Sequence, residues 1–431
     1  MRFRATALAG LLAAGLVAGL AGCAPSTAPA KTDGADKQTG ALRVWLFDEP
    51  NRAPKDKVVN DAIAEFTAAH KDVSVEVTYI AVNTRSERFK GAFNDPSSAP
   101  DVVEYGNTDL PEYVAAGGLA EVGKDVDGWA EGKDLGADLR ASATIDGKLY
   151  GVPWYVGVRA LYYRTDVFSE LSLNPPTSQA DLVAAARQIR AKKPELFGLA
   201  VGGKYTFAAL PFVWDAGGDL ATKSGDTYTA AINSAQSRVG VKAYTDLIKA
   251  DNCPPQQCAD LTGGKTVELF ASGKAGMAIL GNFNRAAVEA GAAKGKYAVV
   301  PLPGTKPGSV APAFAGGNNL GVMKSSQRRT LAADFMKLLA SRKYQQQMYT
   351  AMGNLPTLTS ARTELAGREP FLKPFMDTIA AGTRFVPLHP GWGKIDAQAV
   401  VPTMLEKIVT GKATVDQATD EAATAMNAAF K

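Results

Sequence analysis

Residues 42–79 read LRVWLFDEPNRAPKDKVVNDAIAEFTAAHKDVSVEVTY. The stretch begins with an apolar run typical of a strand. Val59, Ile63 and Phe66 then fall on one face of a helix, because they are four and three residues apart. In residues 73–79 apolar and polar side chains alternate, which is the period of a β-strand. Strand, helix and strand in this order predict an α/β fold with mostly parallel strands.

The ends of the first strands carry polar residues. Asp48 and Glu49 follow the first strand, and a later strand over residues 102–104 leads into the polar stretch 104–109. In parallel sheets ligands bind beyond the carboxyl ends of the strands. We therefore select Asp48, Glu49, Glu104, Asn107 and Asp109 as candidate ligand contacts, although Asp109 precedes Leu110-Pro111 and could instead cap the next helix.

The second half of the chain repeats this pattern. Short apolar runs predict strands over residues 197–201, 277–280, 298–300 and 320–323. Helices are expected over 364–383 and from 402 to the end. A chain of 431 residues is too long for one hydrophobic core, so two α/β lobes are expected.

The first residues have the pattern of a secretory signal. Arg2 and Arg4 precede an apolar core over residues 5–21, and Leu20-Ala-Gly-Cys23 follows. This ending resembles the lipobox of bacterial lipoproteins, which implies a signal peptide over 1–22 and a lipidated Cys23. Residues 23–41 would form a flexible tether. The alternative is an ordinary cleaved signal with a chance cysteine.

No later stretch is apolar for long enough to span a bilayer, so we expect a protein held at the outer face of the cell membrane by lipid alone. The formal net charge of +4 gives no reason to expect a nucleic-acid partner.

Cys253 and Cys258 form the second cysteine feature. Outside the cytoplasm such a pair is expected to form a disulfide, with free thiols or a metal site as alternatives. His70 and His389 are the two histidines of the chain, and both lie far from the pair in sequence. We therefore expect neither a metal nor a cofactor.

Five segments, taken together, resemble the extracellular solute-binding proteins of bacterial sugar importers, the group that includes maltose-binding protein. They are APDVVEYGNT (99–108), IDGKLYGVPW (145–154), ALYYRTDVF (160–168), FASGKAGM (270–277) and GGNNLG (316–321). The resemblance implies the two-lobed periplasmic-binding-protein fold, with a hinge and a ligand cleft between the lobes. It places lobe one at 41–151 plus 312–358 and lobe two at 152–311 plus 359–431.

The same resemblance implies a function. The protein would bind an oligosaccharide, a di- or trisaccharide, outside the cell and deliver it to the permease of an ABC importer. We expect a monomer with no enzymatic activity. A sugar needs aromatic platforms and a hydrogen-bonding rim. The candidate platforms are Trp154, Tyr155, Tyr205, Phe283 and Trp392, and the candidate rim adds Asn318, Asn319 and Arg384 to the strand-end residues above.

Each choice has an alternative. The aromatic side chains could pack in a core, and Arg384 could bridge to a nearby carboxylate. The same fold could bind iron, an anion or a polyamine, and Tyr162-Tyr163 is a tyrosine pair available for iron. A secreted glycosidase is the remaining alternative, but the sequence contains no nucleophile elbow, zinc-binding His-Glu motif or phosphate loop.

Overall fold

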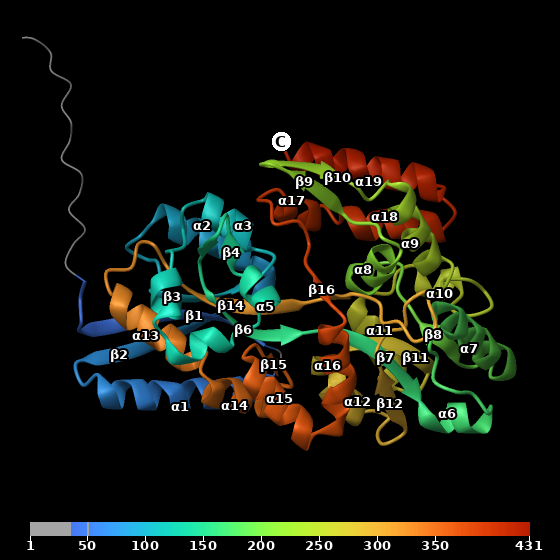
Figure 1. Cartoon of the computed structure of the whole chain (residues 1–431), viewed down its shortest axis with the longest axis horizontal. Coiled ribbons are helices and arrows are strands. Elements are labelled where there is room, and N and C mark those ends of the chain that lie inside the picture. The colour runs from blue at the N-terminus through green and yellow to red at the C-terminus, as the bar shows by residue number, and fades with distance from the viewer. Residues whose placement is uncertain (1–35, 50) are drawn as a thin grey trace, which may run out of the picture. The chain divides into compact units, whose positions relative to one another are not determined.

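The computed structural model describes residues 36–49 and 51–431, and Figure 1 shows two sheets, each covered by helices. The first sheet has the strand order β15-β6-β14-β3-β1-β2. We call this sheet and the helices packed on it the first lobe. Its strands are β1 (Gly40–Phe47), β2 (Val73–Ile80), β3 (Val102–Gly106), β6 (Val152–Gly157), β14 (Gly316–Val322) and β15 (Leu355–Pro356).

The expected parallel arrangement is present where the sequence predicts it. Strand β1 pairs in parallel with β2 and with β3, while β14 runs antiparallel to both β3 and β6. Helix α1 (Ala53–Ala69) buries Val59 and Phe66, as its periodicity predicts. The other helices of the first lobe are α2 (Arg85–Asn94), α3 (Leu110–Ala115), α4 (Gly123–Asp127), α5 (Ala137–Ala141), α13 (Arg329–Leu339) and α14 (Arg342–Met352).

The second sheet has the strand order β12-β7-β11-β8, and with its helices it forms the second lobe. Its strands are β7 (Arg159–Arg164), β8 (Phe197–Ala200), β11 (Ala275–Gly281) and β12 (Tyr297–Val300). Its helices are α6 (Thr165–Glu170), α7 (Gln179–Lys192), α8 (Thr206–Asp215), α9 (Ala235–Thr245), α10 (Pro255–Cys258), α11 (Gly263–Ala271), α12 (Arg285–Glu289), α16 (Lys373–Ala380), α17 (Trp392–Ala397), α18 (Val400–Val409) and α19 (Val415–Ala429).

Two stretches of extended chain pass from one sheet to the other. Strand β6 leads through Val158 directly into β7. Strand β13 (Ala313–Phe314), which pairs with β16 (Thr383–Arg384), leads through Ala315 into β14. Our division assigns residues 152–157 to the second lobe, but β6 pairs with β14 and β15 of the first sheet, so the chain changes sheet at Val158. Two short hairpins, β4–β5 (Thr144–Ile145, Lys148–Leu149) and β9–β10 (Ala221–Ser224, Thr227–Ala230), complete the strands.

The late helices are shorter than expected. The predicted helix over 364–383 is divided into α15 (Thr359–Arg368), a short 3₁₀ turn and α16. Pro370 begins the turn and Pro374 lies in the first turn of α16, because proline cannot donate the hydrogen bond that would continue a helix. The helix predicted from 402 onward is likewise two helices, α18 and α19.

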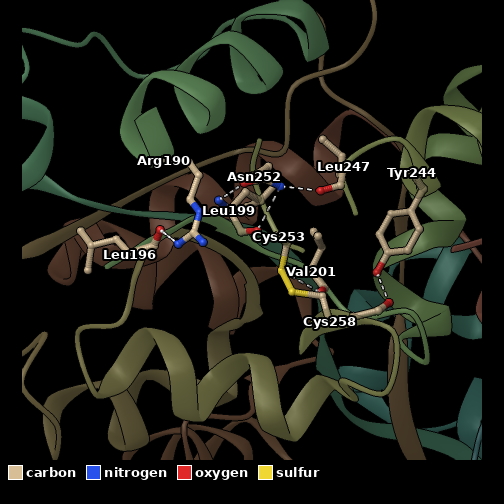
Figure 2. Close-up of a disulfide and its surroundings, with 10 residues drawn as sticks. Arg190, Leu196, Leu199, Val201, Tyr244, Leu247, Asn252, Cys253 and Cys258 are labelled. Atoms are coloured by element: carbon tan, nitrogen blue, oxygen red, sulfur yellow. Dashed lines mark hydrogen bonds between the residues drawn. A yellow bond between two sulfur atoms is a disulfide. The ribbon is translucent and has the colours of Figure 1, made fainter. Parts of the chain in front are cut away.

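Cys253 and Cys258 lie together in the core of the second lobe (Figure 2), with their Cα atoms 5.9 Å apart and their sulfur atoms 2.00 Å apart. Both side chains are fully buried. Next to them the side chain of Asn252 accepts a hydrogen bond from Leu199 N and donates one to Leu247 O. The cysteine pair therefore joins the two ends of the segment that contains α10, and Asn252 ties the start of this segment to β8.

Candidate functional site

The carboxyl ends of the main strands of both sheets meet near the crossing points. Gly281, at the end of β11, leads into Asn282 and Phe283. The side chain of Asn282 accepts a hydrogen bond from Val158 N in the crossing stretch and donates one to Gly353 O, just after α14. A segment of the second lobe is thereby held against the first lobe beside the end of β1.

A cavity of about 630 Å³ opens at this junction. It is lined from the first lobe by Glu49 and Asn51 after β1 and by Met352 and Gly353 at the end of α14. From the second lobe it is lined by Phe283, Arg285 and others. The cavity thus lies between the two lobes, where strand topology predicts a ligand site.

Phe283 presents an aromatic face at this cavity. It is 37% exposed and is the one aromatic residue among the large hydrophobic side chains found exposed in the described part of the chain. Its ring lies against two glycines: a Cβ added at Gly157 would come within 2.7 Å of the ring, and one at Gly281 within 2.3 Å. The missing side chains make room for the ring, part of which stays exposed at the cavity.

Arg159, at the start of β7, stands among aromatic rings. Its guanidinium carbon is 5.4 Å from the ring centre of Tyr205, 5.3 Å from that of Phe207 and 5.6 Å from that of Phe283. Its Nε donates a 2.7 Å hydrogen bond to Tyr205 Oη. Phe207 in turn stacks on Phe314 at 4.4 Å between ring centres. We call Arg159, Tyr205, Phe207, Phe283 and Phe314 the aromatic cluster.

On the first lobe, Glu104 organises a buried polar network. One carboxylate oxygen accepts hydrogen bonds from Lys55 Nζ at 2.9 Å and from Phe47 N at 2.8 Å. The other accepts from Tyr155 Oη and Asn318 Nδ2, both at 2.5 Å. Burial raises the pKa of Tyr155 well above its usual value, so the hydroxyl stays protonated and donates. We call Lys55, Glu104, Tyr155 and Asn318 the Glu104 network.

Two further carboxylates stand near the network. Glu49 lies 3.5 Å from Lys55 Nζ, and burial raises the pKa of its carboxyl above the usual range. Asp109 accepts two hydrogen bonds from the Arg85 guanidinium and one from Gly106 N. Its side chain makes no capping bond to α3, so its partner is the arginine. Glu49 is the freer of the two to accept a hydrogen bond from a ligand.

The sequence of this chain matches the family of bacterial extracellular solute-binding proteins over residues 61–370. The chain belongs to this family. It is 28% identical to the diacetylchitobiose binding protein DasA of Streptomyces coelicolor, over 94% of each chain. It is 26% identical to the galactooligosaccharide-binding protein of Bacillus subtilis, over 96% of this chain and 94% of that one.

The fold of this solute-binding protein is also that of solved relatives. The sugar-binding protein MalE of Xanthomonas citri superposes with a TM-score of 0.79 at 22% identity, over 90% of this chain and 97% of the other. The GacH receptor of Streptomyces glaucescens gives 0.76 at 23% identity, over 91% and 98%. The predicted two-lobed architecture is therefore confirmed.

Two of the expected platforms in this solute-binding protein are core residues. Trp154 is fully buried, and its indole N–H donates to Leu339 O at the end of α13. Its ring centre lies 5.2 Å from that of Tyr155, at the place where the register between β6 and β14 shifts. Trp392 is 3% exposed and packs in the main core of the second lobe. For both tryptophans the core-packing alternative is correct.

Four of the polar candidates contact other groups of the protein. Asn107 bridges β3 to the crossing stretch by donating to Ala315 O, and the fully buried Asn319 donates to Ser142 O. Both therefore act in the structure as internal braces. Arg384 contacts Asp219 at 3.2 Å, which is the bridging alternative. Asp48 is exposed and contacts Arg52 at 3.2 Å.

Several residues in or near the cleft were missed by sequence reasoning. Arg159 follows an apolar run and directly precedes the segment 160–168, so it could have been noticed as a charged residue between two apolar stretches. Phe207, Arg285 and Lys55 carry no comparable signal, since each lies in a helix or at its start.

His389 lines a separate cavity of about 270 Å³ between α3 and the β9–β10 hairpin, where Lys223 of the hairpin lies 3.7 Å from Asp146.

Neither a membrane-spanning helix nor a metal-binding cluster is present among the described residues. None of their helices has the length and apolar character to cross a membrane. In the same part of the chain, no group of three or more histidine, cysteine or acidic residues is arranged to hold a metal ion.

Proposed function

We propose that this protein binds a small carbohydrate, a di- or trisaccharide, outside the cell and delivers it to an ABC-type importer. The names of its relatives support this reading. They include proteins that bind diacetylchitobiose, galactooligosaccharide and maltodextrin. Solved structures with the same fold hold tagatose, acarbose and maltotetraose.

The observation that carries the proposal is the exposed ring of Phe283, which lines the cavity beside polar groups of both lobes. A sugar ring has flat C–H faces and a rim of hydroxyls, so it can stack on an aromatic ring while its hydroxyls bond to the surrounding side chains. Glu49 and Asn51 lie on one side of the cavity and Arg285 on the other. A ligand that bridges these groups would favour closure of the lobes.

The experiment is a thermal-shift screen of oligosaccharides, followed by calorimetric titration of each hit. Phe283→Ala is expected to weaken sugar binding about tenfold, which is a change of about 1.4 kcal/mol. Val239→Ala is the matched control, because Val239 is also an exposed hydrophobic residue but lies on α9. Equal affinity in the wild type and Phe283→Ala would contradict the placement of the site. A screen without any sugar hit would contradict the proposed ligand.

Location and partners form part of the proposal. The signal peptide, Cys23 and most of the expected tether lie outside the described residues. A lipid on Cys23 would keep the receptor near its importer at a high effective concentration. We propose that the protein acts as a monomer, that the Cys253–Cys258 pair is oxidised, and that no reaction is catalysed. Release of monosaccharide from chito- or malto-oligosaccharides would contradict the last point.

The iron alternative loses its main support. Tyr162 is fully buried, and its hydroxyl donates to Gly281 O. Its ring packs against Phe270 and Tyr297 in the core. The pair Tyr162-Tyr163 therefore cannot serve as two iron ligands without unfolding part of the second lobe.

A further inference from the structure

The arginines around the cleft differ in how their charge is balanced. Four of them contact a carboxylate directly. The distances are 3.2 Å for Arg52–Asp48, 2.8 Å for Arg85–Asp109, 2.8 Å for Arg285–Glu369 and 3.2 Å for Arg384–Asp219. These four side chains have little need of a further anion or acceptor.

Arg159 is different. No ion pair joins its guanidinium to a carboxylate anywhere in residues 36–49 or 51–431, and its hydrogen bond within those residues is the one from Nε to Tyr205 Oη. Three aromatic rings surround it at 5.3–5.6 Å. Cation–π contacts stabilise the charge but supply no lone pair to the remaining N–H groups. The side chain is partly exposed, so those groups can reach a ligand.

The two lobes therefore offer opposite chemistry at the cavity. Glu49 lines it from the first lobe, and Arg159 lies next to Phe283, which lines it from the second lobe. Glu49 on the first lobe can accept hydrogen bonds from sugar hydroxyls, whereas Arg159 can only donate. A guanidinium is a rigid planar fork, and the acceptor that matches it best is an sp² oxygen with its lone pairs in one plane. Sugar hydroxyls lack such an oxygen, but an acetamido or carboxylate substituent provides one.

We propose that Arg159 binds an sp² oxygen on the ligand and so selects sugars that carry an acetamido or a carboxylate group. This inference rests on the proposed function and narrows its substrate class. Phe207 and Phe283 flank the guanidinium and would cover the flat substituent or its methyl group. The shared feature of the two sugar types is the planar oxygen, and titrations separate them.

The test is calorimetric titration with three β-1,4-linked disaccharides that differ in the substituent: cellobiose, N,N′-diacetylchitobiose and a glucuronic-acid analogue. The wild type is expected to bind at least one substituted sugar about tenfold more tightly than cellobiose. Arg159→Met, which keeps the stem and removes the donors, is expected to abolish most of that preference. Arg159→Lys would retain more affinity for the carboxylate sugar than for the acetamido sugar, because it keeps the charge but loses the fork.

Arg384→Met is the matched control, since Arg384 lies near the same crossing but is bonded to Asp219. It should leave the preference unchanged. Melting temperatures without ligand show whether each variant is folded. If Arg159→Met weakened all bound sugars equally, Arg159 would have a structural role and the inference would be wrong. The inference would also fail if cellobiose or a maltodextrin bound as tightly as the substituted sugars. Failure of every sugar to bind would contradict the proposed function itself.

Discussion

The two lobes differ in the chemistry of the residue groups that lie near the cleft. On the first lobe, the Glu104 network consists of polar groups that already bond to one another, and Lys55 is 1% exposed. On the second lobe, the aromatic cluster holds a guanidinium that has no carboxylate partner among the described residues, next to an exposed Phe283. The polar groups of the Glu104 network bond to one another, whereas the aromatic cluster offers N–H groups without an acceptor and an exposed aromatic ring.

This difference separates stability from binding. Hydrogen bonds within the Glu104 network hold β1, β3, β6 and β14 in register, so changes there should mainly alter the free energy of unfolding. Changes in the aromatic cluster should mainly alter affinity and selectivity for the ligand. The following substitutions test that division.

Glu104→Gln should have the largest effect. It leaves Lys55 buried next to a neutral amide and removes one of the two acceptor oxygens that Lys55, Phe47 N, Tyr155 and Asn318 share. The free energy of unfolding should therefore fall by about 3–5 kcal/mol. Urea denaturation measures this change. Glu65→Gln, at the exposed Lys343–Glu65 pair, is the control and should cost less than about 1 kcal/mol. Similar losses for the two variants would contradict the role given to the network.

Replacing both Cys253 and Cys258 by serine should have the next largest effect. If the pair is a disulfide, its small loop contributes about 2 kcal/mol by restricting the unfolded chain. The backbone N–H of Gly203 donates to Cys258 O, so the pair also supports the loop that leads to Tyr205. We expect a lower midpoint in urea and a smaller, about twofold, loss of sugar affinity. If the oxidised wild type and the variant had the same midpoint in urea, the cysteine pair would not stabilise the fold.

Tyr205→Phe should reduce selectivity more than stability. It removes the acceptor that orients the Arg159 Nε and should cost about 1 kcal/mol of stability. It should also weaken the preference for substituted sugars about threefold. Tyr244→Phe is the matched control, because its buried hydroxyl donates to Gly202 O in the same lobe. The control should lose similar stability and keep its selectivity; a loss of selectivity in both variants would contradict a specific role for Tyr205.

Much of the fold could be predicted from the sequence. Alternation and helical spacing are local signals, and they located β1, α1 and β2 because each element has one buried face. The strand-end rule selected Glu49 and the family resemblance selected Phe283, and in the structure both line the cavity. Pro370 and Pro374 also have a local effect, and the predicted helix over 364–383 neglected it.

The errors at the site come from contacts that are distant in sequence. In Val152-Pro-Trp-Tyr-Val156 nearly every side chain is apolar, so the pattern cannot show which ring faces the core. The partner that fixes Trp154 is Leu339 O, which lies 185 residues away. Lys55 looks like an ordinary exposed helix residue until Glu104 is brought beside it by the pairing of β1 with β3. The surroundings of Arg159 could not be predicted either, because the three rings next to its guanidinium come from segments that are distant in sequence.

Glu49→Gln should have the smallest effect. It tests whether the charge of Glu49 stabilises or destabilises the first lobe next to the Glu104 network. Burial raises the pKa of Glu49 above its ordinary 4.5, and the nearby charges of Glu104 and Asp48 raise it further, while Lys55 opposes them. A carboxyl with a raised pKa in the folded state favours folding below its unfolded pKa, and this contribution is lost as the pH rises through the folded pKa. Glu49→Gln should therefore be slightly more stable than the wild type at pH 7, with a melting temperature about 1 °C higher, and equal to it near pH 4. Melting curves from pH 4 to 8 measure the difference. A variant that melted below the wild type at pH 7 would show that the 3.5 Å contact with Lys55 outweighs the cost of burying the Glu49 charge. The stability of this region would then depend on the charge of Glu49 as well as on that of Glu104.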